Sequence, residues 1–352
     1  MLYSLLHESH RLFGYITVRS FLALFSSTLI IFILGNWFIE QVKKLSIGQY
    51  IREEGPEEHK KKAGTPTMGG LLIMIATLVP SLLWLDLKNT YVKIIILSSL
   101  YFGIIGFLDD FKKIRSGSNK GLKAKEKFFL QILGGIFIFF YLFVTHPSFT
   151  TISFPFFKEW VFSLGSFYLI IFLLAVVGSS NAVNLTDGLD GLAIGVTLFC
   201  VLAFSVLSYG AGNKIVSSYL QIPYIPGSGE LAIFFASMVG ACLGFLWFNC
   251  YPAQIFMGDT GSLMLGGSIG VGASIIKQEF LLPIIGGIFV LEALSVVLQV
   301  FSYQVFGKRI FLMSPLHHHF EKKNMVETKI VVRFWILSIL FVLLGLTTLK
   351  LR

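Results

Sequence analysis

Ten long apolar stretches, separated by short polar segments, dominate the pattern of this chain. A helix needs about 20 mostly apolar residues to cross the hydrocarbon core of a bilayer, and each stretch approaches that length. The stretches lie at about 21–40, 69–86, 91–108, 128–145, 163–182, 191–209, 231–249, 262–277, 282–304 and 331–349. We therefore predict an all-α, polytopic integral membrane protein of about ten transmembrane helices, folded as a single membrane-embedded domain over residues 1–352.

The composition argues against an ordinary soluble protein. Hydrophobic residues make up 55% of the 352 residues, and charged residues only 13%. Soluble domains carry about 25% charged residues, so this chain has too few charges to cover a surface that faces water. We expect membrane lipid around the helices and no nucleic-acid partner.

Lysine and arginine predict the orientation in the membrane. The loops 41–68, 109–127 and 305–330 hold 18 of the 28 Lys and Arg residues. Basic loops stay on the cytoplasmic side of a bilayer, so we place these three loops in the cytoplasm. An even number of spans then puts both termini on the non-cytoplasmic side.

Carboxylates stand at the ends of apolar stretches on that cytoplasmic face. Asp109 and Asp110 end one stretch; the lysines that follow could simply compensate them, but a carboxylate at membrane depth is costly and usually has a task. Asp259 lies between Gly258 and Gly261, directly before another stretch. There it could bind a hard cation or cap the following helix.

A polar stripe follows the stretch 163–182. Its members recur every three residues, which on a helix places them along one slowly drifting line: Asn181, Asn184, Asp187 and Asp190. The interspersed glycines favour a partly unwound helix end. Backbone that leaves helical pairing at the membrane boundary must line a cavity or lie within protein.

Two further segments on this face could bind anions. His317, His318 and His319 are consecutive; because successive residues point in different directions and no spaced Cys or His partner is present, a structural zinc site is disfavoured. Phosphate binding or proton transfer fits better. Around Lys62 and Thr67, glycines let backbone N–H groups approach an anion, although topology alone also explains the lysines, and the pattern is not a Walker P-loop.

Glu292 and Gln299 lie within the apolar stretch 282–304, two helical turns apart and on one face. A charged carboxylate near the bilayer centre costs a few kcal/mol on insertion scales. We therefore expect both side chains to point inward, toward the other helices and the cytoplasmic cleft. A functional charge and a hydrogen bond to a neighbouring helix both remain open for Glu292.

Basic loops and carboxylates occur together on one face, and this combination indicates phosphoryl-transfer chemistry. It suggests a metal-bridged diphosphate held against cationic side chains, because catalysis of phosphoryl transfer is mostly positioning and charge neutralisation. No motif for ATP or dinucleotide binding occurs in the sequence. The diphosphate is therefore expected to be a substrate.

The same segments resemble the phospho-N-acetylmuramoyl-pentapeptide transferase family, a branch of the polyprenyl-phosphate N-acetylhexosamine-1-phosphate transferase superfamily. The resemblance covers essentially the whole chain. Its motifs, in family order, are Lys-x-x-Gly-Thr-Pro-Thr-Met-Gly-Gly, the Asp-Asp pair, Asn-Leu-Thr-Asp-Gly-Leu-Asp-Gly, Phe-Met-Gly-Asp-Thr-Gly-Ser and Pro-Leu-His-His-His-Phe-Glu. The triple His with Phe-Glu is specific to the muramoyl-pentapeptide branch.

The resemblance implies the first membrane step of peptidoglycan synthesis, at the cytoplasmic face of the bacterial cytoplasmic membrane. UDP-N-acetylmuramoyl-pentapeptide and undecaprenyl phosphate would give lipid I and UMP, with Mg²⁺ as cofactor. Enzymes of this family are usually homodimers, so a homodimer is expected here as well.

The resemblance also implies roles for individual residues. Asp259 is expected to bind the magnesium, Asp109 or Asp110 to act on the lipid phosphate, and His318 to be catalytic. The candidate substrate-binding residues, with those added from the polar stripe and the 282–304 stretch, are Lys62, Thr67, Asn181, Asn184, Asp187, Asp190, Asn249, Phe256, Gln299, His317 and His319.

Two rival interpretations remain at this stage. A sister transferase that uses UDP-N-acetylglucosamine or a similar donor is disfavoured by the triple-His motif. A transporter of an anionic substrate would also contain intramembrane carboxylates and broken helices. However, its acids would lie near the midplane, whereas these gather at one face, and the sequence shows no internal repeat.

Overall fold

The computed structural model describes residues 3, 11–44, 64–117, 121–155 and 160–349, and over these it is an all-α protein apart from one small hairpin. Each of the ten predicted apolar stretches coincides with a long helix. These helices are α2 (Ile16–Lys44), α4 (Gly70–Trp84), α5 (Thr90–Ser116), α6 (Ala124–Thr145), α7 (Tyr168–Thr186), α8 (Leu192–Gly212), α10 (Glu230–Asn249), α11 (Gly258–Ile275), α13 (Gly287–Phe306) and α15 (Glu327–Thr348).

Short elements connect the long helices. They are the helices α9 (Lys214–Leu220), α12 (Leu282–Ile285) and α14 (Leu316–Lys322), the 3-10 helices η1 (Arg11–Gly14), η2 (Pro147–Thr150) and η3 (Gly165–Phe167), and the strands β1 (Thr151–Ser153) and β2 (Val161–Ser163). The two strands pair antiparallel, with Ile152 opposite Phe162.

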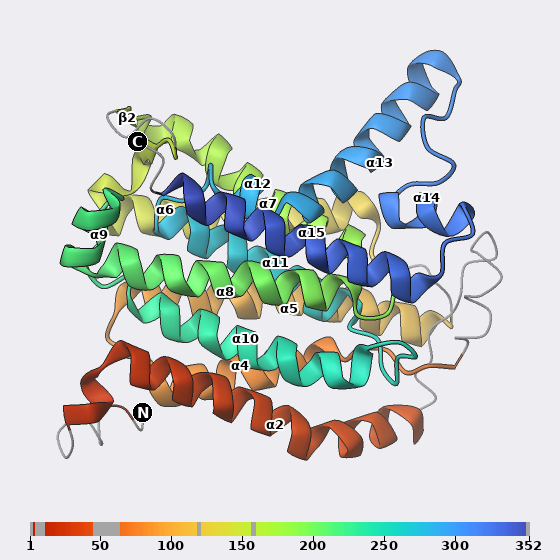
Figure 1. Ribbon diagram of the computed structural model, residues 1–352, viewed down its shortest axis with the longest axis horizontal. Helices are drawn as coiled ribbons and strands as arrows, with labels where there is room; N and C mark the ends of the chain where they lie inside the picture. The colour runs from red at the N-terminus through yellow and green to blue at the C-terminus, as the bar shows by residue number, and fades with distance from the viewer. Residues whose placement is uncertain (1–2, 4–10, 45–63, 118–120, 156–159, 350–352) are drawn as a thin grey trace.

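The polytopic membrane character that we predicted is confirmed. Among the described helices, eight are long and apolar enough to cross a bilayer, and α4 is a shorter apolar helix. The long helices run side by side (Figure 1), with the hairpin, η1 and the end of α15 at one end of the bundle and α14 at the other. Which end faces the cytoplasm stays a prediction.

The glycine-rich helix α11 forms the centre of the bundle. All its residues from Asp259 to Ile275 are buried, and it packs mainly against α5 and α7. A Cβ atom at Gly266 would lie 2.4 Å from the carbonyl oxygen of Ser179, and one at Gly270 would lie 2.5 Å from that of Ala175. Small residues thus bring the backbones of α7 and α11 into direct contact.

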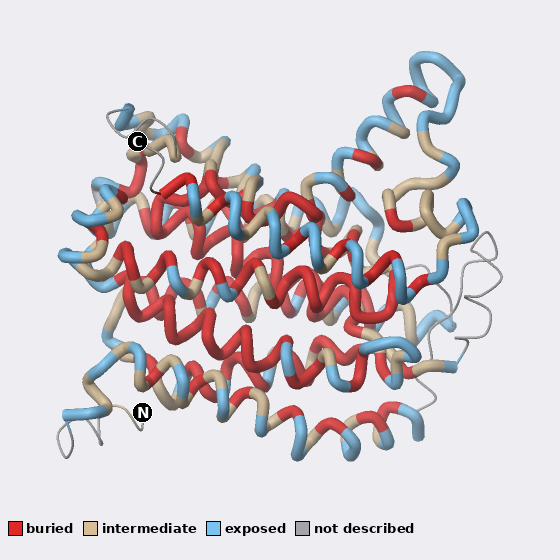
Figure 2. Tube along the Cα trace, viewed as in Figure 1, coloured by how far each residue is buried: buried red, intermediate tan, exposed pale blue. Residues whose placement is uncertain are grey.

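Burial increases toward this centre. In Figure 2 the tube is mostly buried along α8, α10 and α11, whereas α2 and α13 alternate with exposed positions. Large apolar side chains such as Phe25, Leu298 and Phe301 are more than 40% exposed on these outer helices. Such an exposed apolar surface suits lipid rather than water.

One local expectation was wrong. The stretch 282–304 is not one helix: it breaks at Gly286 into α12 and α13, and α13 then leans away from the bundle (Figure 1). Between α8 and α10 the chain forms the short helix α9.

Candidate active site

The acidic pair at the end of α5 is buried, with Asp109 only 1% and Asp110 only 3% exposed. The Asp110 carboxylate accepts hydrogen bonds from the backbone N–H groups of Asp259 (3.1 Å) and Thr260 (2.9 Å) and from the Thr260 hydroxyl (2.7 Å). It therefore caps the first turn of α11, whose N–H groups have no partner within the helix. Asp109 accepts a hydrogen bond from the N–H of Leu122 (2.8 Å).

Asp259 lies in the first turn of α11, beside the acidic pair. A Cβ atom at Gly106 of α5 would lie 2.2 Å from the carbonyl oxygen of Asp259, so glycine is what allows the two helices to approach here. Asn184 donates a hydrogen bond to Asp259 Oδ1 (3.0 Å). The alternative that Asp259 caps its own helix is wrong, because its side chain makes no capping bond and Asp110 supplies the cap instead.

Two lysines bind this carboxylate cluster. Lys113 Nζ lies 2.6 Å from Asp109 Oδ2, 3.1 Å from Asp259 Oδ1 and 3.7 Å from Asp110 Oδ1. Lys127 Nζ, from α6, lies 3.4 Å from Asp109 Oδ1 and forms a close ion pair with Asp259 Oδ2. We had considered Lys113 only as charge compensation for the acidic pair, which its i,i+4 spacing from Asp109 favours, and Lys127 only for topology. No sequence spacing links Lys127 to either acid.

The cluster suits a divalent cation. One carboxylate oxygen from each of Asp109, Asp110 and Asp259 lies within 4.8 Å of the others. Asp109 Oδ2 is buried, and Lys113 Nζ lies 2.6 Å from it. An all-oxygen donor set of this kind matches the preference of Mg²⁺.

Charge keeps Asp259 ionised. Burial by itself would raise the pKa of this carboxyl, but the ammonium groups of Lys113 and Lys127 lower the pKa below its ordinary value. Asp187 behaves differently, because burial raises its pKa to about 7 and the charges of Asp259 and Asp110 add to the shift. Asp187 thus lies within electrostatic reach of the cluster.

One residue of the polar stripe contacts the carboxylate cluster, and others bond the segments around it. Helix α7 ends at Thr186, as the predicted unwinding requires, and Asn184 is directed to the cluster. Asn181 instead donates a hydrogen bond to Gln131 Oε1 (2.8 Å). Asp190 Oδ2 accepts the N–H of Ala253 (3.0 Å), so it holds the loop before α11.

Asn249 has a similar framework role. Its Oδ1 accepts the N–H of Gly191 (3.2 Å), and its Nδ2 donates to the carbonyl of Ile255 (2.9 Å). Asn249 therefore ties the turn after α7 to the loop that carries Phe256.

Backbone pairing brings Thr67 to the same place. Phe256 donates its N–H to the carbonyl of Pro66 (2.8 Å), and Gly69 donates its N–H to the carbonyl of Phe256 (2.8 Å). Thr67 and Phe256 therefore lie on adjacent segments at the start of α11, and both are partly buried. Lys62 lies outside the described residues.

The three histidines belong to α14 and have three different environments. The fully buried His317 ring packs against Gly188, where a Cβ atom would lie 2.2 Å from Nε2. His318 Nδ1 lies 2.6 Å from Glu321 Oε2, and His319 Nδ1 accepts the N–H of Leu312 (3.1 Å). This arrangement agrees with the expectation that the three rings do not face one zinc ion.

Gln299 and Glu292 both lie on the side of α13 that faces α14. Gln299 accepts the N–H groups of Ile310 and Phe311 and donates to the carbonyl of Phe311. Glu292 is fully buried, as predicted, and bonds to the start of α14.

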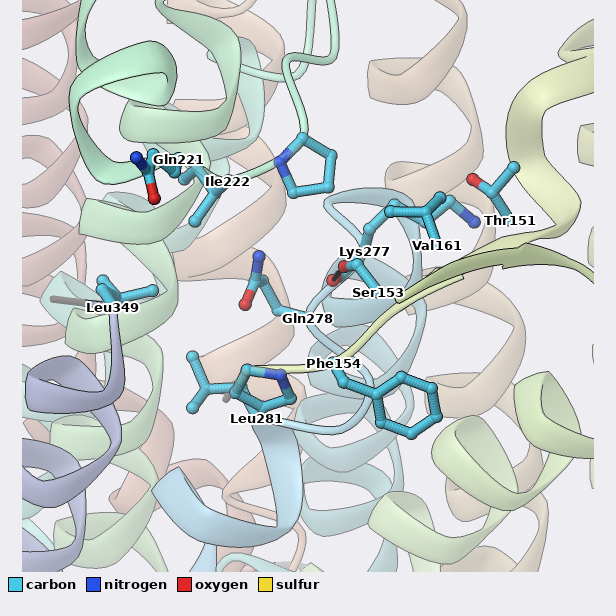
Figure 3. Close-up of a pocket in the computed structure, with 12 residues that line it drawn as sticks. Thr151, Ser153, Phe154, Val161, Gln221, Ile222, Lys277, Gln278, Leu281 and Leu349 are labelled. Carbon is cyan, nitrogen blue, oxygen red and sulfur yellow. Dashed lines mark hydrogen bonds between the residues drawn. The ribbon is translucent and has the colours of Figure 1, made fainter. Parts of the chain in front are cut away.

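A cavity of about 290 Å³ lies apart from this site. Its lining comes from the β1–β2 hairpin, the segment 221–223, the connection 277–281 and Leu349 (Figure 3). These segments lie at the hairpin end of the bundle, opposite α14 (Figure 1). The chemistry-bearing residues therefore do not line this cavity; they form the acidic cluster at the opposite end.

Comparison with known proteins gives a consistent result. Residues 92–277 match the family described as glycosyl transferase family 4, and residues 62–74 match phospho-N-acetylmuramoyl-pentapeptide-transferase signature 1. Proteins called phospho-N-acetylmuramoyl-pentapeptide-transferase are similar over the full length of both chains. Identity is 52% over 360 residues for the protein from Desulfotalea psychrophila, 50% over 362 for that from Citrifermentans bemidjiense and 50% over 361 for that from Thermodesulfovibrio yellowstonii.

Proposed function

The chain belongs to the phospho-N-acetylmuramoyl-pentapeptide-transferase family, and from this premise we propose how its acidic cluster serves the reaction. It is a multi-pass membrane transferase that moves phospho-N-acetylmuramoyl-pentapeptide to a lipid carrier in peptidoglycan synthesis. The observation that carries the proposal is the cluster of Asp109, Asp110 and Asp259 with two lysines, at one end of the bundle.

The substrates follow from the family. The donor is UDP-N-acetylmuramoyl-pentapeptide, and the acceptor is undecaprenyl phosphate. An oxygen of the lipid phosphate forms a bond to the phosphorus that carries the sugar, and the bond from that phosphorus to the bridging oxygen of the diphosphate breaks. UMP leaves with the bridging oxygen, and lipid I keeps the new diphosphate.

The two acids of the pair have different roles in this proposal. Both carboxylate oxygens of Asp110 accept hydrogen bonds from the first turn of α11, so Asp110 holds Asp259 in place. Asp109 takes no part in that cap, and its Oδ2 lies 2.6 Å from Lys113 Nζ, which supports Asp109 as the group that acts on the lipid phosphate. Lys113 and Lys127 offset the negative charge of the phosphates. Catalysis of phosphoryl transfer comes mostly from such charge neutralisation and from positioning.

Magnesium is the proposed cofactor. Asp259, with Asp109 and Asp110, would hold it. Bound there, Mg²⁺ would neutralise charge on the diphosphate and on the leaving UMP. Thr67, Asn184, Asp187, Phe256 and His318 would contact the donor, together with Lys62. Asn181, Asp190, Asn249, Gln299, His317 and His319 support this site through the hydrogen bonds and packing described above.

The setting is also proposed. The three basic loops support a position of the acidic cluster at the cytoplasmic face of the bacterial cytoplasmic membrane, with both termini outside. We propose one membrane domain per chain and a homodimer, as in the family.

Release of UMP tests the function. Purified protein is incubated with undecaprenyl phosphate, Mg²⁺ and either UDP-N-acetylmuramoyl-pentapeptide or UDP-N-acetylglucosamine. We expect UMP only from the first donor. Equal or faster release from the second would assign the chain to a sister transferase, and uptake of an intact anion into vesicles without UMP release would favour the transporter.

The metal assignment is tested in the same assay. Asp259→Asn should abolish turnover while the melting temperature stays close to that of the wild type, because the variant removes a ligand charge without removing the cap on α11. Near-normal kcat for Asp259→Asn at low Mg²⁺ would contradict the assignment.

A further inference from the structure

Glu292 is a buried acid whose two oxygens are both engaged by α14. The side chain is 0% exposed, although it lies within an apolar helix. Oε2 accepts the N–H of Leu316 (2.6 Å), and Oε1 accepts the N–H of His317 (3.2 Å). Oε1 also lies 3.2 Å from His317 Nδ1. The carboxylate therefore meets the segment that carries the triple histidine, not lipid.

These bonds compensate for a missing cap. The first N–H groups of a helix have no partner within it, and the residue before α14 is Pro315, whose side chain makes no capping hydrogen bond. A buried N–H group without a partner carries a free-energy cost. The Glu292 carboxylate removes that cost for two N–H groups at once, and it does so only when α14 starts at one defined place.

The position of α14 determines where His317 and His318 lie. The His317 ring rests on Gly188, the residue after Asp187, and the His317 and His318 rings are 4.2 Å apart. Farther along α13, Gln299 bonds the backbone of Ile310 and Phe311. Helix α13 thus binds the chain at two places, before α14 through Gln299 and at the start of α14 through Glu292. In this position the His317 ring lies against Gly188.

We infer that Glu292 is a positioning residue for the transfer reaction: its carboxylate anchors α14 so that His317 docks on Gly188 and His318 is held beside it. The inference rests on the proposed function for the reaction it serves, but the anchoring itself is a structural claim. Glu292 contacts no carboxylate of the cluster in the described contacts, so it acts through α14.

The primary test compares Glu292→Gln with Ser295→Ala. Ser295 is also buried on α13, and its hydroxyl bonds only the carbonyl of Glu292 among the described residues, so Ser295→Ala is the matched control. Glu292→Gln should lower kcat for UMP release about 100-fold, because a displacement of about 1 Å in a catalytic segment costs that much, with little change in KM. The control should keep wild-type kcat.

Two readouts separate positioning from a general loss of structure. Amide hydrogen exchange at Leu316 and His317 should be faster in Glu292→Gln and unchanged in Ser295→Ala. In addition, the double variant with His318→Ala should be no slower than His318→Ala alone, because the anchor affects the rate only by positioning His318, which is then already missing. Unchanged exchange, or rate losses that multiply in the double variant, would overturn the inference.

Gly188→Ala keeps the test decisive if Glu292→Gln does not fold. The added methyl group collides with the His317 ring from the opposite side while the Glu292 anchor stays intact. We expect a fall in kcat without faster exchange at Leu316, and wild-type kcat would refute the docking. Absence of UMP release by the wild type would instead reject the proposed function, and the exchange experiment would still decide the anchoring.

Discussion

At the scale of single residues, the pair Asp109–Asp110 shows how neighbours in sequence take different tasks. The two side chains lie about 100° apart around α5, so one faces the start of α11 and the other faces Leu122 and the lysines. Sequence reasoning identified the pair from its position at the end of an apolar helix. It could not assign the roles, because the partners come from other helices.

This difference predicts that substitutions of the two acids affect the stability of the protein differently. Asp110→Asn should lower the melting temperature, because an amide NH₂ would face the N–H groups of α11, and loss of a helix cap costs about 1–2 kcal/mol. Asp109→Asn should leave the melting temperature nearly unchanged. Both variants should lose several orders of magnitude in kcat. Thermal unfolding in detergent, measured beside UMP release, checks the pair, and equal melting temperatures would contradict the division of roles.

At the scale of elements, the sequence predicts helices well and their interruptions poorly. Every apolar stretch forms a helix because a lipid-facing segment must satisfy its own backbone. The break at Gly286 and the helix α9 escaped prediction, since both depend on contacts outside their own segments. The same reason hid Lys127: its relation to Asp109 and Asp259 exists only after α6 packs beside α5 and α11.

The contact of α7 with α11 leads to a prediction at this scale. Gly270→Ala places a methyl group 2.5 Å from the carbonyl oxygen of Ala175, so the helices must separate, and overpacking of this kind costs about 1–3 kcal/mol. Because α7 carries Asn184 and α11 carries Asp259, kcat should fall together with the melting temperature. Gly178→Ala, on the open side of α7 with no neighbour within 4 Å, is the matched control.

The control should be neutral or slightly stabilising, because alanine favours a helix more than glycine does. The measurement is the melting temperature of both variants in the same detergent, with UMP release alongside. Identical melting temperatures for Gly270→Ala and Gly178→Ala would show that α7 and α11 tolerate a wider spacing than the structure indicates.

At the scale of the whole molecule, the bundle has two polar ends of different character. One end carries the acidic cluster, whose carboxylates are matched by lysines and backbone N–H groups. The other end holds Glu279, between α11 and α12, which is only 5% exposed; Lys277, Tyr168 and its own backbone N–H compensate the carboxylate only in part. A buried acid with so little compensation makes the stability of the bundle depend on pH.

The direction of that dependence follows from the pKa. Burial raises the pKa of Glu279 from its ordinary 4.5 to about 7, and the nearby Lys277 opposes the shift only in part. Between those two values the folded chain holds the proton and the unfolded chain has lost it, so stability falls as the pH rises through this window. Glu279→Gln has no such proton to lose, and Glu40→Gln, at an exposed position on α2, is the matched control.

We therefore expect the wild type to lose a few degrees of melting temperature relative to Glu279→Gln between pH 5 and pH 7, and to keep a constant difference from Glu40→Gln. UMP release should be little affected by Glu279→Gln at either pH, since Glu279 lies at the end of the bundle away from the acidic cluster. Melting curves in detergent over this pH range check the expectation. A wild-type melting temperature that rises relative to Glu279→Gln would mean that Glu279 is ionised and well compensated in the fold, with Lys277 as its full partner.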